Sequence, residues 1–340
     1  MSTYAEAGIH LDDAHATTER IAGIVARART AGVLADVGAF GGMFRLNAAG
    51  HLADPVLVAS ADGIGTKVKI ASALGRYEGL GADIVNHCLN DIAVQGARPL
   101  FFLDYIALHR ADPAVVTSLV GSVAAACEAA GMALLGGETA EMPDIYPPGE
   151  FDLAGFIVGV LDREEVGANG EPETGDVLLG LPSDGLHTNG FSLARRALPP
   201  ETWGEFDPAL GMTAGEALLV PHRAYLSEIQ ALIGVGGRGF AHITGGALPE
   251  NVARTMPAGT AAEIDITLWQ PPTIFRRIAE RGGIAQDEMY RVFNMGVGVV
   301  AAVPEERVDA AMEAATAAIR IGRVVPRIEG EAVRLVGLAG

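Results

Sequence analysis

Short apolar runs alternate with amphipathic segments along the whole chain, which predicts a protein that mixes helices and strands. Runs that are short and rich in β-branched or aromatic residues indicate strands. In the first half, the predicted strands are Pro55–Ser60, Pro99–Ala107, Met132–Leu135 and Phe151–Val160. The predicted helices are Asp13–Thr30, Gly81–Gln95 and one that Asp112 caps, with Pro113 in its first turn.

The second half shows the same alternation of predicted strands and helices. It follows a polar, turn-forming stretch at Gly167–Gly175, where we place a domain boundary. The predicted domains are therefore residues 1–168 and 169–340. The predicted strands of the second half are Asp176–Leu181, Gly239–Ile243 and Gly296–Val303. Helices are expected from about Asn189, after a capping box at Thr213–Glu216 that should open a long helix, and after Pro304.

Net charge, the length of the apolar runs and the cysteine content limit the classes of function that the chain can have. The 340-residue chain has a net charge of −18, which argues against a nucleic-acid partner because such a partner requires a basic face. No apolar run reaches the roughly 18 residues of a membrane span, and no leader-like segment is seen, so we expect a cytoplasmic protein without a membrane partner. Cys88 and Cys127 are expected to be isolated buried thiols.

The stretch Ala59–Ile70 contains the only two lysines of the chain, Lys67 and Lys69; the other 22 basic residues are arginines. Lysine is a compact point charge that suits a phosphate oxygen. Asp62 precedes it and could hold a magnesium ion, and the nearby glycines let backbone N–H groups approach an anion. The spacing is not that of a Walker A loop. A strand-end turn with solvated lysines explains the stretch equally well.

The predicted helix Gly81–Gln95 has a polar stripe on an otherwise apolar helix. Asp83, His87 and either Asn90 or Asp91 recur at helical spacing. Buried polar groups need partners, so contact with a metal or ligand is one explanation. A solvated face or internal capping is the other, and spacing alone slightly favours it.

The segment Gly136–Pro143 follows a short apolar strand, the place where open α/β sites often put ligand groups. Glu138 could complete a carboxylate set with Asp62 and Asp91 around Mg²⁺. The alternative is a flexible turn with solvated acids, which the preceding Gly-Gly pair makes less attractive.

Two further loops carry candidate groups. Ser183–Phe191 lies between a strand and a helix start, where free N–H groups can bind an anion. His187 adds a possible proton carrier there, beside Thr188 and Asn189. The alternative is a helix cap with a solvent-exposed histidine. The second loop, His242–Ala247, is Gly-rich, but by itself it is only a weak signal of a functional site. A nucleophile elbow, a Cys-x-x-Cys pair and a dinucleotide fingerprint are all missing.

Taken together, these segments resemble the phosphoribosylformylglycinamidine cyclo-ligase (AIR synthetase) family of purine biosynthesis. Similarity extends in order over nearly the whole length, and jointly the segments are highly specific. The matching stretches are PVLVASADGIGTK (55–67), CLNDIAVQGARPLFFLDY (88–105), GGETAEMP (136–143), DLAGFIVGV (152–160), HTNGFSL (187–193), HITGG (242–246) and EMYRVFNMGVG (288–298).

The resemblance implies an α+β subunit of two AIR-synthetase-like domains, with the N-terminal domains pairing into a shared β-barrel in a homodimer. It implies ATP and Mg²⁺ as cofactors and formylglycinamidine ribonucleotide as substrate. ATP activates the formamide oxygen, an internal nitrogen attacks, and aminoimidazole ribonucleotide, ADP and phosphate result. Phosphorylation turns a poor leaving group into a good one, so the protein's task is positioning and charge neutralisation.

By the same resemblance, site residues are expected in four groups. The metal carboxylates are Asp62, Asp91 and Glu138. The ATP-binding residues are Gly63, Gly65, Thr66, Lys67, Asn90, Gly136 and Gly137. The substrate-binding residues are Ser183, Thr188, Thr244, Gly245 and Gly246. The catalytic residues are His187, Asp62 and Asn189, with His187 the candidate for proton transfer.

The chain departs from the family at residues 245–247, which read Gly-Gly-Ala where Gly-Gly-Gly is common, and in its first helix, where arginines replace lysines. Two other functions stay open. One is another ATP-dependent phosphoryl transfer of the same superfamily, of the thiamine-monophosphate kinase or selenophosphate synthetase type. The other is a nucleotide-binding protein without turnover, which the joint presence of Asp62, Lys67, Asp91 and Glu138 disfavours.

Overall fold

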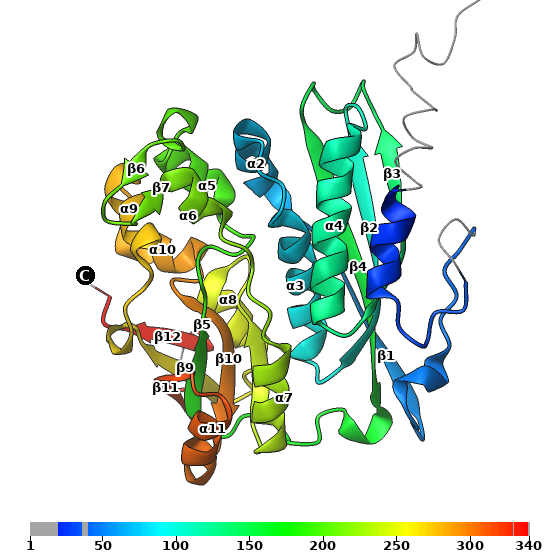
Figure 1. Cartoon of the computed structure of the whole chain (residues 1–340). Coiled ribbons are helices and arrows are strands. Elements are labelled where there is room, and N and C mark those ends of the chain that lie inside the picture. Colours follow the sequence, from blue (N-terminus) through cyan, green and yellow to red (C-terminus); the bar gives the residue numbers. More distant parts are fainter. Residues whose placement is uncertain (1–19, 36–39, 329, 339–340) are drawn as a thin grey trace, which may run out of the picture. The chain divides into compact units, whose positions relative to one another are not determined.

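The computed structural model describes residues 20–35, 40–328 and 330–338. They fall into two compact units. Unit 1 contains the described residues up to Ile92 together with Ala97–Arg163, and unit 2 contains Ala93–Gly96 and the described residues from Glu164 onward. Each unit has its own mixed sheet and its own helices, which confirms the α+β expectation (Figure 1).

Unit 1 is built on a four-stranded sheet in the order β1-β4-β2-β3. Its strands are β1 (Pro55–Gly63), β2 (Arg98–Leu108), β3 (Ala133–Glu141) and β4 (Phe151–Asp162). Strand β4 pairs antiparallel with β1 and β2, and β2 pairs parallel with β3. Because side chains alternate between the two faces of a strand, each face of this sheet has its own set of residues.

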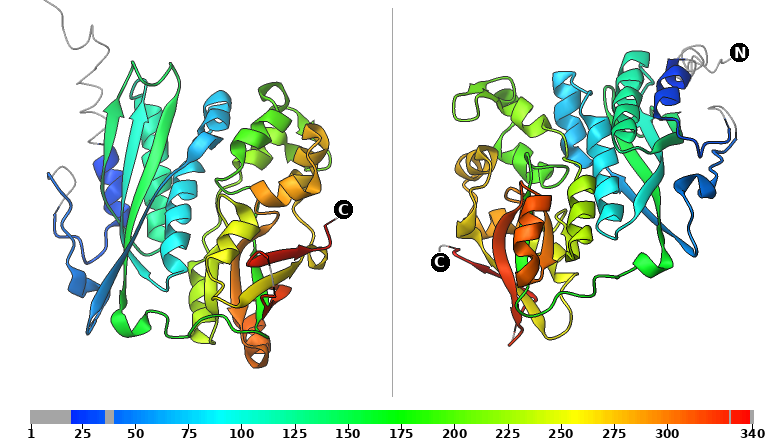
Figure 2. Two further views of the ribbon diagram at one scale, coloured as in Figure 1. Left: turned by 180° about the vertical axis from the view of Figure 1, so that it is seen from behind. Right: turned by 60° about the horizontal axis from the view of Figure 1, so that its bottom comes forward.

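Helices α3 (Leu80–Ala93) and α4 (Pro113–Ala129) cover one face of the unit 1 sheet (Figure 1). A Cβ at Gly155 would meet Ile84 of α3, so this glycine lets the helix approach the sheet closely. The Asp112 side chain accepts a hydrogen bond from the N–H of Ala114, as the sequence predicts. The strands lie in front of α4 in the left view of Figure 2, and Leu57 and Phe156 on this other face are 60% and 44% exposed.

Unit 2 is built on a six-stranded sheet in the order β12-β9-β11-β5-β10-β8. The strands are β5 (Val177–Pro182), β8 (Arg238–His242), β9 (Thr260–Asp265), β10 (Val297–Val303), β11 (Ile319–Pro326) and β12 (Val333–Val336). All residues of β10 are buried. Side chains of α7 and α11, such as Ile229 and Val308, share an apolar cluster with Leu179 of β5 and Val299 of β10.

Shorter elements connect these parts. The remaining helices are α2 (Val68–Leu74), α5 (Phe191–Ala197), α6 (Ala214–Leu219), α7 (Leu226–Gly234), α8 (Ala247–Ala253), α9 (Thr273–Gly282), α10 (Gln286–Val292) and α11 (Val308–Ala314). The 3-10 turns are η1 (Ala26–Ala28), η2 (Leu46–Ala49), η3 (Gly65–Lys67), η4 (Arg163–Glu165), η5 (Pro200–Thr202), η6 (Ile266–Leu268) and η7 (Glu305–Arg307). A two-stranded ribbon consists of β6 (Phe206–Asp207) and β7 (Met212–Thr213).

Several sequence expectations need correction in their extent. The Thr213–Glu216 capping box is present, but α6 ends at Leu219, since Pro221 cannot continue the helix. Strand β1 continues to Gly63, and β3 includes Gly136–Glu138, so these residues belong to strands and not to loops. The sequence reasoning did not predict β9, β11 or β12. Part of the first predicted helix lies outside the described residues, and residues 20–25 are helical.

Both cysteines are buried free thiols, as expected. In the described part of the chain, no helix has the length and apolar character needed to cross a membrane.

Candidate functional site

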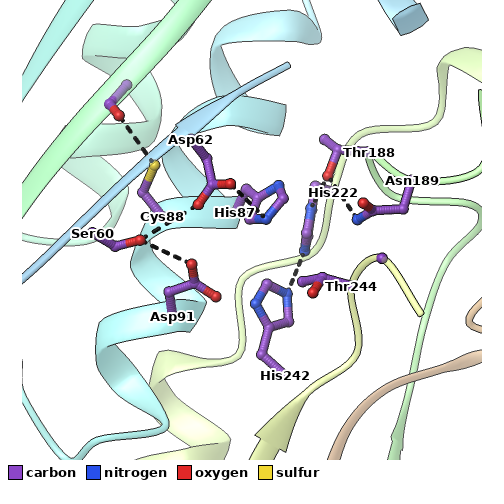
Figure 3. Close-up of polar contacts among 12 residues, drawn as sticks. Ser60, Asp62, His87, Cys88, Asp91, Thr188, Asn189, His222, His242 and Thr244 are labelled. Carbon is purple, nitrogen blue, oxygen red and sulfur yellow. Dashed lines mark hydrogen bonds and ion pairs between the residues drawn. The ribbon is translucent and has the colours of Figure 1, made fainter. Parts of the chain in front are cut away.

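The acidic candidates Asp62 and Asp91 come together in unit 1 (Figure 3). Ser60 Oγ donates to Asp91 Oδ2 at 2.9 Å and lies 3.4 Å from Asp62 Oδ2. Ser60 and Asp62 are two residues apart on β1, so both side chains point to the face that α3 covers, where Asp91 is located. The polar stripe of α3 therefore faces partner groups inside the protein, and is not a solvated helix face.

The two carboxylates perturb each other. Partial burial, the hydrogen bond with Asp91 and the negative charge of Asp91 together raise the pKa of Asp62 to about 7, while the hydrogen bond with Ser60 opposes the shift. Two nearby carboxylates favour sharing a proton or binding a cation, either of which removes the repulsion. Hard carboxylate oxygens suit Mg²⁺, so the donor set fits this ion.

Two neighbours of the pair were not assigned a role from the sequence. His87 Nε2 lies 3.6 Å from Asp62 Oδ1, and the Cys88 thiol donates to the Gly155 carbonyl at 3.7 Å. Burial raises the pKa of Cys88 well above its usual range, with Asp62 and Asp91 adding to the effect. Cys88 is therefore a neutral packing group, whereas His87 is placed to hydrogen-bond Asp62. Its helical spacing from Asp91 was the signal available in the sequence.

Lys67 has a different position from the one expected. It is completely buried, and its Nζ lies 2.7 Å from Asp83 Oδ1, which is also fully buried. Burial lowers the pKa of Lys67, and the charge of Asp83 opposes this shift. Within the chain this ammonium has Asp83 as its ion-pair partner, and the expected phosphate contact stays a prediction. The second lysine, Lys69, is half exposed and pairs with Glu150.

Glu138 does not join the acidic pair within the chain. It lies on β3 opposite Tyr105 of β2, and β4 and β2 separate β3 from β1. Three strand spacings amount to roughly 14 Å. Residue parity also places Glu138 on the uncovered face, whereas Asp62 points to the helix-covered face. Within one chain the structure brings Asp62 and Asp91 together without Glu138, because sequence spacing contains no information on strand order. A metal-binding role for Glu138 stays a prediction.

The other expected ATP-binding residues of unit 1 are spread out. Gly63 and Gly65 are exposed and Thr66 is half-buried, directly beyond Asp62. Asn90 is completely buried on α3. Gly136 and Gly137 lie on β3, and a Cβ at Gly137 would collide with the Asp104 carboxylate. Only the Gly63–Thr66 segment therefore adjoins the acidic pair.

In unit 2 the candidate His187 sits in the loop between β5 and α5 with φ of +63°, a backbone conformation that non-glycine residues seldom adopt. The residue is buried. A Cβ at Gly298 of β10 would lie 2.7 Å from His187 Cε1 and 2.1 Å from the Tyr225 hydroxyl, so glycine at this position makes room for both. Strain at a buried histidine is typical of functional positions.

His187 belongs to a group of three histidines that the sequence reasoning did not predict. Its ring stacks on His222, with centroids 3.9 Å apart and planes 14° apart. His222 Nε2 lies 3.1 Å from His242 Nε2, and His222 Nδ1 lies 3.4 Å from Thr188 Oγ1 (Figure 3). His222 follows α6 and has no local motif around it, so only the folded chain reveals its partners.

The substrate-side loops are also connected. Asn189 Nδ2 donates to Thr188 Oγ1 at 3.4 Å, and a Cβ on Gly245 would lie 3.6 Å from Asn189 Oδ1. The 187–189 and 244–246 segments are therefore neighbours within unit 2, as the expected joint role requires.

Internal hydrogen bonds hold the turn at 244–246. Asn251 Nδ2 donates to the carbonyls of Gly245 and Ala247, and Thr244 Oγ1 lies 3.3 Å from Asn251 Oδ1. Gly246 and Ala247 both have positive φ, so alanine at the position that departs from the family is strained. The turn keeps its shape through Asn251 despite this departure.

Ser183 has an internal structural role. Its hydroxyl lies 2.9 Å from Asn294 Oδ1 and 3.0 Å from the Gly185 carbonyl, and Asn294 in turn donates to Gly185. Ser183 is buried, so its hydroxyl ties β5 to the segment before β10. The Ser183 hydroxyl thus fixes this loop, and its expected substrate contact stays a prediction.

Family comparisons match both halves of the chain. Residues 46–161 match the family described as AIR synthase related protein, N-terminal domain. Residues 173–333 match the family described as AIR synthase related protein, C-terminal domain. The chain belongs to the AIR synthase related proteins. The two matched segments contain Asp62 and Asp91 in the first and His187, His222 and His242 in the second.

Solved structures of the same fold include a thiamine-monophosphate kinase from Stenotrophomonas maltophilia K279a, with 19% identity, a TM-score of 0.64, and 93% of this chain and 95% of that chain covered. The hydrogenase maturation protein HypE in complex with ATP has 16% identity, a TM-score of 0.65, and coverages of 93% and 90%. AaThiL complexed with AMPPCP and TMP has 20% identity, a TM-score of 0.56, and coverages of 83% and 84%. At these identities the likeness concerns the AIR synthase related fold.

Proposed function

We propose that this protein is an ATP-dependent enzyme that transfers the terminal phosphoryl group to an oxygen of a small substrate. The observation that carries the proposal is the Asp62–Ser60–Asp91 cluster, in a chain of the AIR synthase related family. Solved relatives of the same fold whose titles name ATP or AMPPCP support the nucleotide.

The residues have distinct roles in this proposal. Asp62 and Asp91 hold Mg²⁺, and the ion neutralises phosphate charge when bound. Backbone N–H groups at Gly65 and Thr66 contact the phosphates, since these residues follow Asp62 closely and Gly65 is exposed. The N–H of the buried Ile64 already donates to the Leu153 carbonyl. In unit 2, Thr188, Asn189 and Thr244 position the acceptor, and His187 moves a proton at a ring nitrogen.

The specific reaction we propose is the ring closure of formylglycinamidine ribonucleotide to aminoimidazole ribonucleotide. Its support is the set of ordered sequence segments, above all 187–193 and 242–246, two of which the fold brings together beside His187. Transfer of phosphate to the formamide oxygen creates a leaving group, and His187 accepts the proton from the attacking nitrogen.

The structural similarities favour a second candidate, phosphoryl transfer of the thiamine-monophosphate kinase type. In that reaction the phosphorylated acceptor is itself the product, and no ring closes. The two candidates share the Asp62–Asp91 pair and differ in the acceptor.

We also propose that two copies of the chain associate through the uncovered face of the unit 1 sheet. Leu57 and Phe156 expose apolar surface there, and Ala61 of β1 is the register partner of Phe156 on the same face. A sheet face with exposed apolar side chains loses solvent contact when a second sheet packs on it.

A Leu57→Asp variant should shift the dimer to monomer in analytical ultracentrifugation. The matched control Phe206→Asp, at an exposed position of unit 2, should leave association unchanged.

The deciding experiment measures ADP release from Mg-ATP with formylglycinamidine ribonucleotide or thiamine monophosphate, and follows the aminoimidazole product in the same sample. Release that depends on the first substrate and equals the ring product in amount supports the cyclo-ligase. Release with thiamine monophosphate alone supports the kinase. ATP binding without any turnover contradicts both enzymes.

The Asp62→Asn variant tests the shared part of the proposal. It should lower turnover at least about 100-fold, because the remaining carboxylate holds the ion and phosphates poorly. The control Asp309→Asn removes the same charge from a fully exposed side chain and should keep full activity. Full activity of Asp62→Asn would exclude this metal assignment for either acceptor.

A further inference from the structure

The three histidines of unit 2 form a second cluster that the proposed phosphoryl transfer does not need as a set. One ring nitrogen from each of His187, His222 and His242 lies within 4.8 Å of the other two. All three side chains are buried. Buried polar rings need partners, and a single metal ion can serve all three.

Hydrogen bonds fix how the rings are oriented. The Tyr225 hydroxyl donates to the Pro182 carbonyl at 2.8 Å, which leaves its oxygen to accept from His187 Nε2, 3.4 Å away. This arrangement gives His187 a lone pair on Nδ1. His222 Nδ1 faces Thr188 Oγ1 at 3.4 Å, and this hydroxyl can donate to a ring nitrogen or accept from it.

The nitrogen His222 Nε2 faces His242 Nε2 at 3.1 Å, so one hydrogen links them. In a tetrahedral zinc site with Zn–N bonds of about 2.05 Å, two ligand nitrogens lie about 3.3 Å apart. The observed separation is therefore close to that of two ligands of one ion. The His187 ring is stacked on His222, so on binding it would have to leave the stack and turn a lone pair toward the ion.

We propose that His187, His222 and His242 bind a borderline divalent transition ion such as Zn²⁺, with a water molecule or a substrate atom in the fourth position. Neutral imidazoles are the usual nitrogen ligands of such ions, and Mg²⁺ prefers oxygen. The ion takes the place of the hydrogen between His222 and His242. That hydrogen moves to the other ring nitrogen of the histidine that carried it, so all three rings bind as neutral imidazoles.

The surroundings of the cluster resemble those of a built metal site. Ligand histidines commonly direct their second ring nitrogen to an oxygen that holds the ring in place. Tyr225 has this role for His187, and Thr188 has it for His222. Glycine at position 298 admits the His187 ring, since a Cβ would collide with it. The half-buried Asn189 and Thr244 adjoin the cluster and give the ion a short way in.

The test is titration of the full-length protein with Co²⁺ and then Zn²⁺ in excess Mg²⁺, which keeps the acidic pair of unit 1 occupied by the harder ion. We expect one Co²⁺ per chain with the intense visible absorption of four-coordinate cobalt, displaced by Zn²⁺. The absence of this absorption band would overturn the proposal.

Variants assign the ligands. His222→Ala and His242→Ala should each weaken Zn²⁺ binding at least about tenfold. Loss of a hydrogen-bond partner of a ligand already lowers metal affinity by about this factor, and loss of the ligand itself should lower it at least as much. The control His51→Ala removes an exposed imidazole from unit 1 and should leave affinity unchanged. Should an alanine variant fail to fold by circular dichroism, His222→Gln preserves a polar group and serves the same comparison. Equal zinc affinity in a folded His222 variant and the parent protein would overturn the site.

Discussion

Residues of β1 in unit 1 alternate between exposed and half-buried, whereas every residue of β10 in unit 2 is buried. Both strands are apolar in sequence, but only β10 is an internal strand whose residues are all enclosed. Strand β1 is an edge strand whose covered side carries Ser60 and Asp62. The comparison teaches that unit 2 has a strand buried on both sides, while unit 1 combines an uncovered apolar face with charged groups beneath the other.

The largest expected effect comes from the charged side of unit 1. Lys67→Met leaves Asp83 buried without its ammonium and should lower the free energy of unfolding by about 3–5 kcal/mol. The double variant Lys67→Met/Asp83→Leu removes both charges and should recover most of the loss. Urea unfolding of the parent protein, Lys67→Met, Asp83→Leu and the double variant measures this coupling. If the single and double variants lose equal stability, the pair does not act as a unit.

The second effect is a pH dependence at the same sheet. Burial raises the pKa of Asp104 on β2 to about 7. The folded state therefore holds a proton that the unfolded state loses from about pH 4 upward, and stability falls as pH rises to about 7. At about 1.4 kcal/mol for each pKa unit, the fall is at most roughly 4 kcal/mol. Asp104→Asn should flatten this part of the profile, as urea midpoints at pH 5 and pH 8 can show. An unchanged difference between the two pH values would contradict the buried acid.

The third prediction compares the two sheets directly. Val300→Ala in the enclosed strand β10 should cost about 2 kcal/mol through lost burial and a cavity. Leu57→Ala on the uncovered face should cost less than about 0.5 kcal/mol when measured in the monomer at low concentration. Thermal unfolding of both variants provides the values, and equal losses would mean that the β1 face is covered in solution.

The smallest effect concerns a local motif. Thr213→Ala removes the hydroxyl that accepts from the Glu216 N–H and should cost about 1 kcal/mol. Glu216 also accepts from the Thr213 N–H, so Glu216→Ala should have a similar cost. Denaturant midpoints of both variants test it. No loss in either would show that this cap contributes nothing to unit 2.

Elements with local signals could be predicted from the sequence. The strands at 55–63, 98–108 and 297–303 have compact apolar runs, and the caps at Asp112 and Thr213 are short-range motifs. Strands β9, β11 and β12 were not predicted from the sequence. The polar stripe of α3 could be recognised in the sequence. That it is buried could not, because this follows from its contact with Ser60 and Asp62 of β1.

By itself, the sequence determined the types of element, the two-domain AIR synthase related character and the segments that contain candidate chemistry. These follow from periodicity, local capping and ordered motifs, all of which are short-range. Tertiary structure decided which groups meet: Asp62 with Asp91 but not Glu138, Lys67 with Asp83, and His187 with His222 and His242. Strand order and residue parity set these contacts, because they bring together residues far apart in the chain and assign each to one face.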